Sequence, residues 1–186
     1  MFEPWETFYL LIGTSAGALV GVMFVVITLT GEVAAEQINR GTVIYQTPTV
    51  FHLAVIVAIS AMTMVPEHLI AVAAVLLVAI GLVGAAYAVL TFFRTYENYS
   101  FYHATVADRL FFGALPALLY VALAIGGGAV FGMPEMAADL IAAATMLLLL
   151  LSVRNAWDLA TFSVRLSRLQ RQQAPETKAA PEGAAE

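Results

Sequence analysis

Five long apolar runs constrain the fold of this chain more than any other feature of its sequence. They cover residues 8–30, 48–65, 68–93, 111–131 and 136–162. A helix needs about 20 apolar residues to cross the hydrocarbon core of a bilayer, and the backbone polar groups in that core must be satisfied within the helix itself. The sequence therefore predicts an all-α, polytopic integral membrane helical bundle with five transmembrane helices.

The composition excludes several other classes of protein. Of the 186 residues, 61% are apolar and 11% are charged, against roughly 45–50% and about 25% in globular domains. The absence of cysteine excludes disulfides, thiolate metal sites and cysteine nucleophiles. A net charge of -5 and the lack of a basic block before residue 150 argue against nucleic acid as a partner. We expect a small multi-pass protein of the bacterial inner membrane, with the lipid bilayer as its main partner.

The connections between the runs indicate which helices are neighbours. Pro66-Glu67 and residues 132–135 are short connections, so the second and third runs form one helical hairpin and the fourth and fifth form another. Pro48 and Pro134 stand where proline suits the first turn of a helix. An alternative interpretation makes the second and third runs re-entrant halves, which leaves four spans.

Five spans place all eight Lys and Arg side chains on one side of the membrane. They are Arg40 in the first loop on that side, Arg94 and Arg109 around the second, and five more within 154–178. Because such residues are retained on the cytoplasmic side, the sequence predicts an N-terminus outside and a cytoplasmic C-terminus. Residues 1–7 contain acids but no base, so no cleavable signal peptide is expected. Residues 1–171 should form one transmembrane domain, and 172–186 a disordered tail with few bulky apolar residues.

Glycines in the first run form a helix-packing face. Gly13, Gly17 and Gly21 fall within an arc of about 80° on a helix, which gives a flat groove where another helix can approach closely. This pattern predicts tight packing within the protomer or between protomers, and no substrate site. The glycines at 126–128 in the fourth run repeat the pattern, with a gating hinge as the alternative interpretation.

Polar side chains share one face of the second run. On a helix, four further polar residues lie within about 80° of His52. They are Thr49, Ser60, Thr63 and Glu67, and Ile56 is the apolar position between them. An ionisable group in hydrocarbon is costly, so this stripe must face protein or water. One interpretation is a pore-lining helix with a constriction at Ile56. In the other, Ser and Thr bond carbonyls of their own helix, while His52 and Glu67 lie at opposite interfaces.

Acidic residues gather on the predicted outer side. Glu135 and Asp139 begin the fifth run, and the outer side has three further acids but no Lys or Arg. Such an acidic outer mouth would concentrate cations. Negative charge is also favoured in the first turns of a helix, which explains Glu135 and Asp139 without any ligand.

The last span ends in a polar cluster at the predicted inner boundary. Arg154 and Asp158 stand at i, i+4 and can form an ion pair, with Asn155 beside them. The simpler interpretation is a snorkelling arginine neutralised by Asp158 and anchored by Trp157. The alternative is a clasp to side chains of the preceding inner loop, namely Tyr96, Tyr99, Tyr102 or His103. The arginines at 165, 168 and 171 either contact anionic lipid or simply form a basic helix end.

Metal sites and enzymatic chemistry have little support in the sequence. His52 and His68 are separated by most of the membrane, and only His52 and His103 could meet, which would give a single bis-His haem or a poor metal site. Motifs for nucleophiles, phosphate loops and metalloproteases are absent. An intramembrane enzyme would have only His103, Asp108 and Arg109 as an ionisable cluster. We therefore expect no metal, no cofactor and no enzyme activity.

Two functions fit these observations. One protomer of five helices is too small to enclose a wide aqueous path, so transport would need an oligomer. The leading hypothesis is a homo-oligomeric channel or facilitator for a small cation, with the polar stripe lining its axis and Ile56 as a hydrophobic gate. The alternative is a non-transporting accessory or assembly subunit, which docks on a larger membrane complex through its glycine faces.

Overall fold

The structure is a computed structural model that describes residues 2–30, 47–97 and 106–178. Within these ranges the chain is helical and contains no strand. The five long helices are α1 (Glu6–Thr30), α3 (Thr47–Thr63), α4 (Ile70–Glu97), α7 (Leu115–Ala129) and α8 (Pro134–Lys178). Short elements connect or precede them: η1 (Glu3–Trp5), η3 (Glu67–Leu69), α6 (Val106–Arg109) and the π-helix η4 (Leu110–Ala114).

Four segments are long and apolar enough to cross a membrane. They are Glu6–Val26, Ile70–Thr95, Val106–Ala129 and Pro134–Thr161, and they support the predicted membrane protein with an all-α fold. α3 is a shorter apolar helix of 17 residues, or about 25 Å at 1.5 Å per residue, slightly less than the roughly 30 Å hydrocarbon core.

The helix boundaries follow the predicted runs, with two differences. Pro48 and Pro134 lie in the first turns of α3 and α8, as expected. The fourth run is irregular, because α6 and the π-helix η4 precede the regular helix α7.

α8 continues to Lys178, so residues 172–178, predicted to be disordered, are helical. This stretch contains Pro175, which removes one intrahelical hydrogen bond, but extending an existing helix needs no new nucleus. Residues 179–186 lie outside the described residues.

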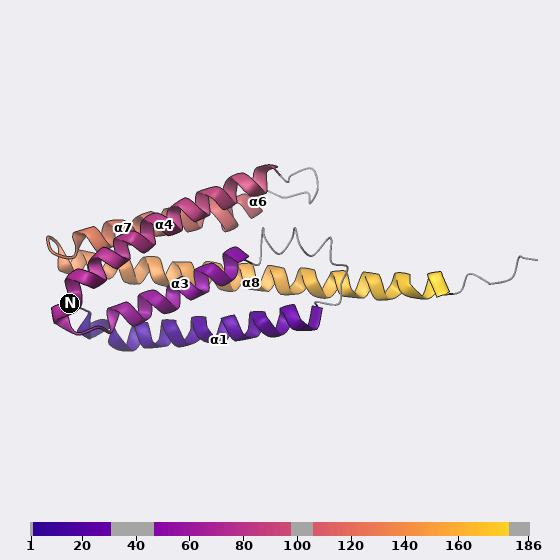
Figure 1. The fold of residues 1–186 in the computed structure, drawn as a ribbon, viewed down its shortest axis with the longest axis horizontal. Coiled ribbons are helices and arrows are strands. Elements are labelled where there is room, and N and C mark those ends of the chain that lie inside the picture. The colour runs from indigo at the N-terminus through magenta and orange to yellow at the C-terminus, as the bar shows by residue number, and fades with distance from the viewer. Residues whose placement is uncertain (1, 31–46, 98–105, 179–186) are drawn as a thin grey trace, which may run out of the picture.

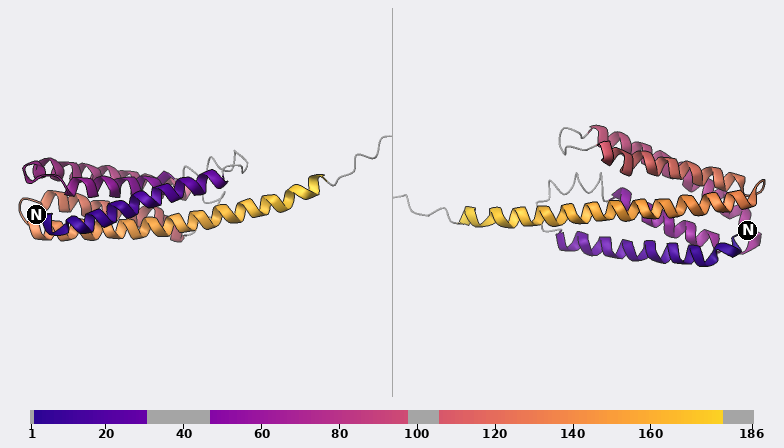
Figure 2. Two further views of the ribbon diagram at one scale, coloured as in Figure 1. Left: turned by 90° about the horizontal axis from the view of Figure 1, so that it is seen from below. Right: turned by 180° about the vertical axis from the view of Figure 1, so that it is seen from behind.

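α8 is the central helix of the bundle. It packs against α1 and α3 on one side and against α7 on the other, while α4 packs mainly against α7 (Figure 1). The N-terminus and the turns at 64–66 and 130–133 meet at one end, which we call the hairpin end. At the opposite end, called the tail end, α8 projects beyond the other helices (Figure 2).

Glycines set the closest contacts between helices. A Cβ atom added to Gly13 would lie 2.8 Å from Cβ of Ser60, so the first predicted packing glycine joins α1 to α3. Nothing lies within 4 Å of such an atom at Gly17 or Gly21. Gly126 packs against Ile141, and its neighbour at 127 contacts α4. These contacts give the glycines at 126 and 127 a packing role in the regular helix α7.

Candidate functional site

The predicted stripe of α3 lies inside the protomer. Thr49, His52 and Ile56 are fully buried, and Ser60 and Thr63 are nearly so, with 4% and 6% of their surface exposed. Neighbouring helices of the same chain, α1 and α8, cover this face together with Tyr120 of α7.

The sixth predicted member of the stripe does not continue it. α3 ends at Thr63, and Glu67 begins the separate element η3 after Pro66. Proline disfavours the helical conformation of the preceding residue and lacks the amide donor that helix continuation requires. The position predicted for Glu67 required the helix to continue through Pro66, and α3 does not continue that far.

His52 is held by an aromatic cluster, which consists of Phe51, His52, Tyr87 and Tyr120. His52 Nδ1 and the Tyr120 hydroxyl form a buried hydrogen bond of 2.8 Å between residues 68 positions apart in the chain. The ring centroids of Phe51 and Tyr87 are 4.4 Å apart, and those of His52 and Tyr120 are 5.5 Å apart. The cluster thus connects α3 to both α4 and α7.

The polar side chains of the bundle interior fall into two groups. In the first group a hydroxyl donates to a carbonyl of its own helix, as Thr63 does to Ser60 at 2.9 Å, Thr145 to Ile141 at 2.7 Å and Ser152 to Leu148 at 2.8 Å. Of these residues only Thr63 belongs to the stripe, and its bond to its own helix is of the kind that the second interpretation of the stripe predicts.

In the second group a buried polar atom has no hydrogen-bond partner in the described protein. Among these atoms are the Tyr9 hydroxyl, Ser60 Oγ and His52 Nε2. A buried polar atom left without a partner costs about 1–3 kcal/mol, and ordered water commonly satisfies such atoms in proteins.

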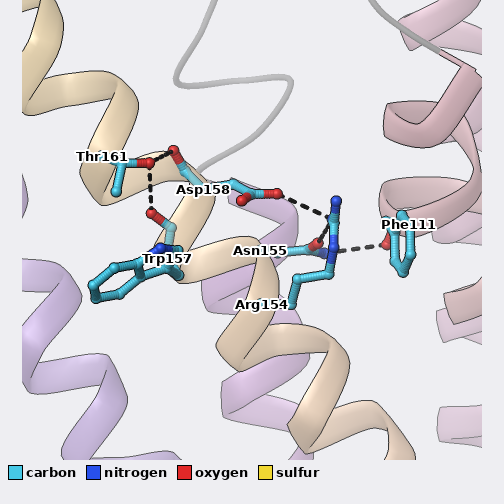
Figure 3. Close-up of polar contacts among 6 residues, drawn as sticks. All are labelled: Phe111, Arg154, Asn155, Trp157, Asp158 and Thr161. Atoms are coloured by element: carbon cyan, nitrogen blue, oxygen red, sulfur yellow. Dashed lines mark hydrogen bonds and ion pairs between the residues drawn. The ribbon is translucent and has the colours of Figure 1, made fainter.

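A second polar cluster lies at the tail end, where α8 meets the π-helix η4. Asn155 is fully buried and its Nδ2 donates to the Phe111 carbonyl at 3.1 Å, as Figure 3 shows. The Arg154 guanidinium lies 3.5 Å from the Phe111 ring centroid and forms the predicted ion pair with Asp158 at 3.1 Å. The partner that the structure describes for Asn155 is thus the Phe111 carbonyl, which belongs to the π-helix η4.

The other partners considered for this cluster lie outside what the structure describes. Tyr99, Tyr102 and His103 fall outside the described residues, and the side chain of Tyr96 is not described. Phe111 could not be identified from the sequence, because any backbone carbonyl can accept a hydrogen bond and nothing in the residue order predicts a π-helix at this point.

The predicted acidic residues lie at the hairpin end. Glu135 and Asp139 of α8 border an open pocket of about 400 Å³, together with Trp5 of η1 and the residues Pro4, Pro134 and Ala138. Both acids are exposed. The pocket lies between the N-terminal segment and the start of α8.

The described residues hold no group of three or more His, Asp or Glu that could bind a metal ion. His103, the partner considered for a haem or metal site, lies outside them. His52 instead shares its Nδ1 with Tyr120. A tyrosine in an apolar run signals a buried hydroxyl in need of a partner, and this signal could have drawn attention to Tyr120.

The fold and its buried polar side chains define a class: helical bundles of membrane-protein character with a partly polar interior. No family model, curated protein or solved structure matches the chain.

Proposed function

We propose that the protein is a facilitator for a small cation, with a path along the polar stripe of α3 inside each protomer. The observation that carries this proposal is the pair of buried atoms His52 Nε2 and Ser60 Oγ, which lie on one face of α3, on either side of Ile56, and have no hydrogen-bond partner among the described residues. Polar and ionisable groups inside a membrane are costly and typically mark ion or proton pathways.

The burial of the stripe favours this path over one along an oligomer axis. The side chains of Thr49, His52 and Ser60 are covered by helices of their own chain, so a second copy is not needed to enclose them. Oligomers remain part of the proposal through α1, whose glycines at 17 and 21 have no neighbour within 4 Å of an added Cβ atom.

We also propose five spans in the bacterial inner membrane, with the hairpin end outside and the tail end in the cytoplasm. Exposed acids, among them Glu6, Glu135 and Asp139, belong to the hairpin end, whereas Arg94 and Arg154 belong to the tail end. This asymmetry supports the orientation through the preference of Lys and Arg for the cytoplasmic side. α3 lies alongside α1 and α8 but is shorter than α1 and α4 (Figure 1), and its packing lengthwise against these helices supports its role as the fifth span.

Single-cysteine labelling tests this topology, because the chain contains no cysteine. In intact cells, a membrane-impermeant maleimide is expected to label Glu6→Cys, and to label Ala174→Cys only after permeabilisation. Labelling of both variants in intact cells would contradict an odd number of spans.

Ile56→Thr is expected to raise cation flux into proteoliposomes several-fold. Ile56 is fully buried between the two unpartnered polar atoms, and apolar constrictions gate by excluding water. Threonine keeps the β-branched shape and adds a hydroxyl at this level. Flux is measured with cation-sensitive dyes in the vesicle lumen.

Val57→Thr is the matched control, because Val57 is the next residue of α3 and has 39% of its surface exposed. Its flux should equal that of the wild type. Equal flux in both variants would place the path elsewhere, and a wild type without flux for any cation would refute the facilitator.

A second candidate, an accessory or docking subunit, is favoured by α1. Less of α1 is buried inside the protomer than of any other candidate span, and the open glycines at 17 and 21 leave space for a foreign helix. Purification in mild detergent separates the candidates: a stoichiometric foreign protein supports docking, and a particle of identical chains supports the facilitator.

A further inference from the structure

His52 presents one ring nitrogen to a partner and the other to the bundle interior. A neutral imidazole carries one N–H donor and one acceptor lone pair. Nδ1 shares a 2.8 Å hydrogen bond with the Tyr120 hydroxyl, while Nε2 is buried and has no partner in the part of the chain that the structure describes. With the Nδ1 proton donated to the Tyr120 oxygen, Nε2 carries the free lone pair and can take up a proton.

The groups around His52 favour a proton over a metal cation. The titratable groups that face it are Tyr120 of α7 and Tyr87 of α4, whose ring lies 6.5 Å from the imidazole between centroids. The buried Tyr9 of α1 lies in the first turn of that helix, at the hairpin end. The buried polar side chains of α8 are those of Thr145, Ser152 and Asn155, which do not titrate.

The buried polar side chains of the described chain include no carboxylate. Metal cations require several oxygen ligands, often carboxylates, to replace their water, and most carbonyls of a transmembrane helix are engaged within it. A proton has no such requirement, because it moves along hydrogen bonds between water and a single basic nitrogen. The interior of this bundle is therefore better suited to protons than to metal cations.

We propose that the transported cation is the proton and that Nε2 of His52 relays it between water on the two sides of His52; this inference rests on the proposed facilitator and names its substrate. Nε2 accepts a proton from a hydronium ion on the Ser60 side, which forms an imidazolium and leaves water. The same N–H then gives its proton to water on the tail side, which regenerates the neutral imidazole. One proton enters, one leaves, and nothing is oxidised or reduced.

Tyr120 is a positioning residue in this scheme. In this scheme the Nδ1–H donates to the Tyr120 oxygen, which is one of the two directions that the 2.8 Å contact allows, and this direction holds the tautomer whose lone pair is on Nε2. Ser60 Oγ and the Tyr9 hydroxyl are both buried and have no partner within residues 2–30, 47–97 and 106–178. They would hold the waters that lead from the hairpin end.

The test uses the purified full chain in proteoliposomes with a K⁺ diffusion potential, with a pH dye in the lumen and, in parallel, dyes for Na⁺ and Tl⁺. The wild type is expected to carry protons and neither metal ion. His52→Gln should lower proton flux at least about tenfold, since proton transfer by a positioned group contributes about 10²–10⁴-fold in other sites. His68→Gln is the matched control, because His68 is exposed at the hairpin end, and it should keep wild-type flux.

Tyr120→Phe separates positioning from packing. It keeps the ring that fills the interior and removes only the hydroxyl, so the pH dependence of proton flux should change, while the variant stays folded with a thermal midpoint lowered only by the loss of one buried hydrogen bond. An unchanged pH profile would overturn the positioning role.

The remaining outcomes are equally decisive. Wild-type flux of Na⁺ or Tl⁺ without protons would overturn the proton inference but keep the facilitator, and this measurement does not depend on any variant folding. Proton flux that persists in folded His52→Gln would overturn the relay. Flux of no cation would overturn both the inference and the proposed function.

Discussion

Gly81→Ala is expected to destabilise the bundle by about 3 kcal/mol, at the upper end of the cost of overpacking a core. A Cβ atom at Gly81 would lie 2.6 Å from the Ala124 backbone nitrogen and 2.7 Å from the Tyr120 carbonyl oxygen. Backbone atoms cannot move aside by a rotamer change, so α4 and α7 must separate. The free energy of unfolding is measured in mixed micelles by titration with a denaturing detergent.

Gly128→Ala is the control, because nothing lies within 4 Å of a Cβ atom there. In a helix interior, alanine is more favourable than glycine by about 1 kcal/mol, so this variant should be as stable as the wild type or slightly more so. Equal unfolding midpoints for the two variants would show that α4 and α7 do not approach as closely as the structure has them.

Much of the fold could be predicted from the sequence, because each helix must by itself be long and apolar enough to cross the hydrocarbon core of the bilayer. The starts of α3 and α8 follow from Pro48 and Pro134, and each apolar run corresponds to a helix in the structure. The helical angle alone groups Thr49, His52, Ser60 and Thr63 on one face, and all four are buried. These properties depend on residues near one another in the chain.

The contacts between helices could not be predicted in the same way. The hydrogen bond between His52 and Tyr120 joins residues 68 positions apart, and no local pattern selects that pair over others. The glycine pattern in α1 predicts a packing face, but only Gly13 meets a neighbour in the protomer. Gly81 and Gly84, which contact α7 most closely, have a spacing of three and stand in an ordinary apolar run.

The π-helix at the tail end also could not be predicted from the sequence. Residues 110–114 contain two aromatic residues, a glycine and apolar residues that suit a regular helix. The longer hydrogen-bond spacing of a π-helix arises where tertiary contacts stabilise it, and such elements are frequent at functional sites. Asn155, 44 positions later in the chain than Phe111, supplies one such contact.

Asn155→Leu is expected to destabilise the bundle by about 1–3 kcal/mol, which is the usual cost of leaving a buried polar group without its partner. Leucine has a similar size and fits an apolar interior, so packing is largely kept. The Phe111 carbonyl, however, loses the donor that lies 3.1 Å away in the fully buried side chain of Asn155. The same detergent titration measures the free energy of unfolding.

Asp158→Asn is the matched control within the same cluster. Its carboxylate pairs with Arg154 at 3.1 Å, but the two side chains have 47% and 38% of their surface exposed, and exposed ion pairs contribute about 0–1 kcal/mol. The loss of stability should therefore be smaller than that of Asn155→Leu. If Asp158→Asn were the more destabilising variant, the ion pair rather than the hydrogen bond to Phe111 would hold α8 against the π-helix. The two measurements together thus decide which contact fixes the tail end of the bundle.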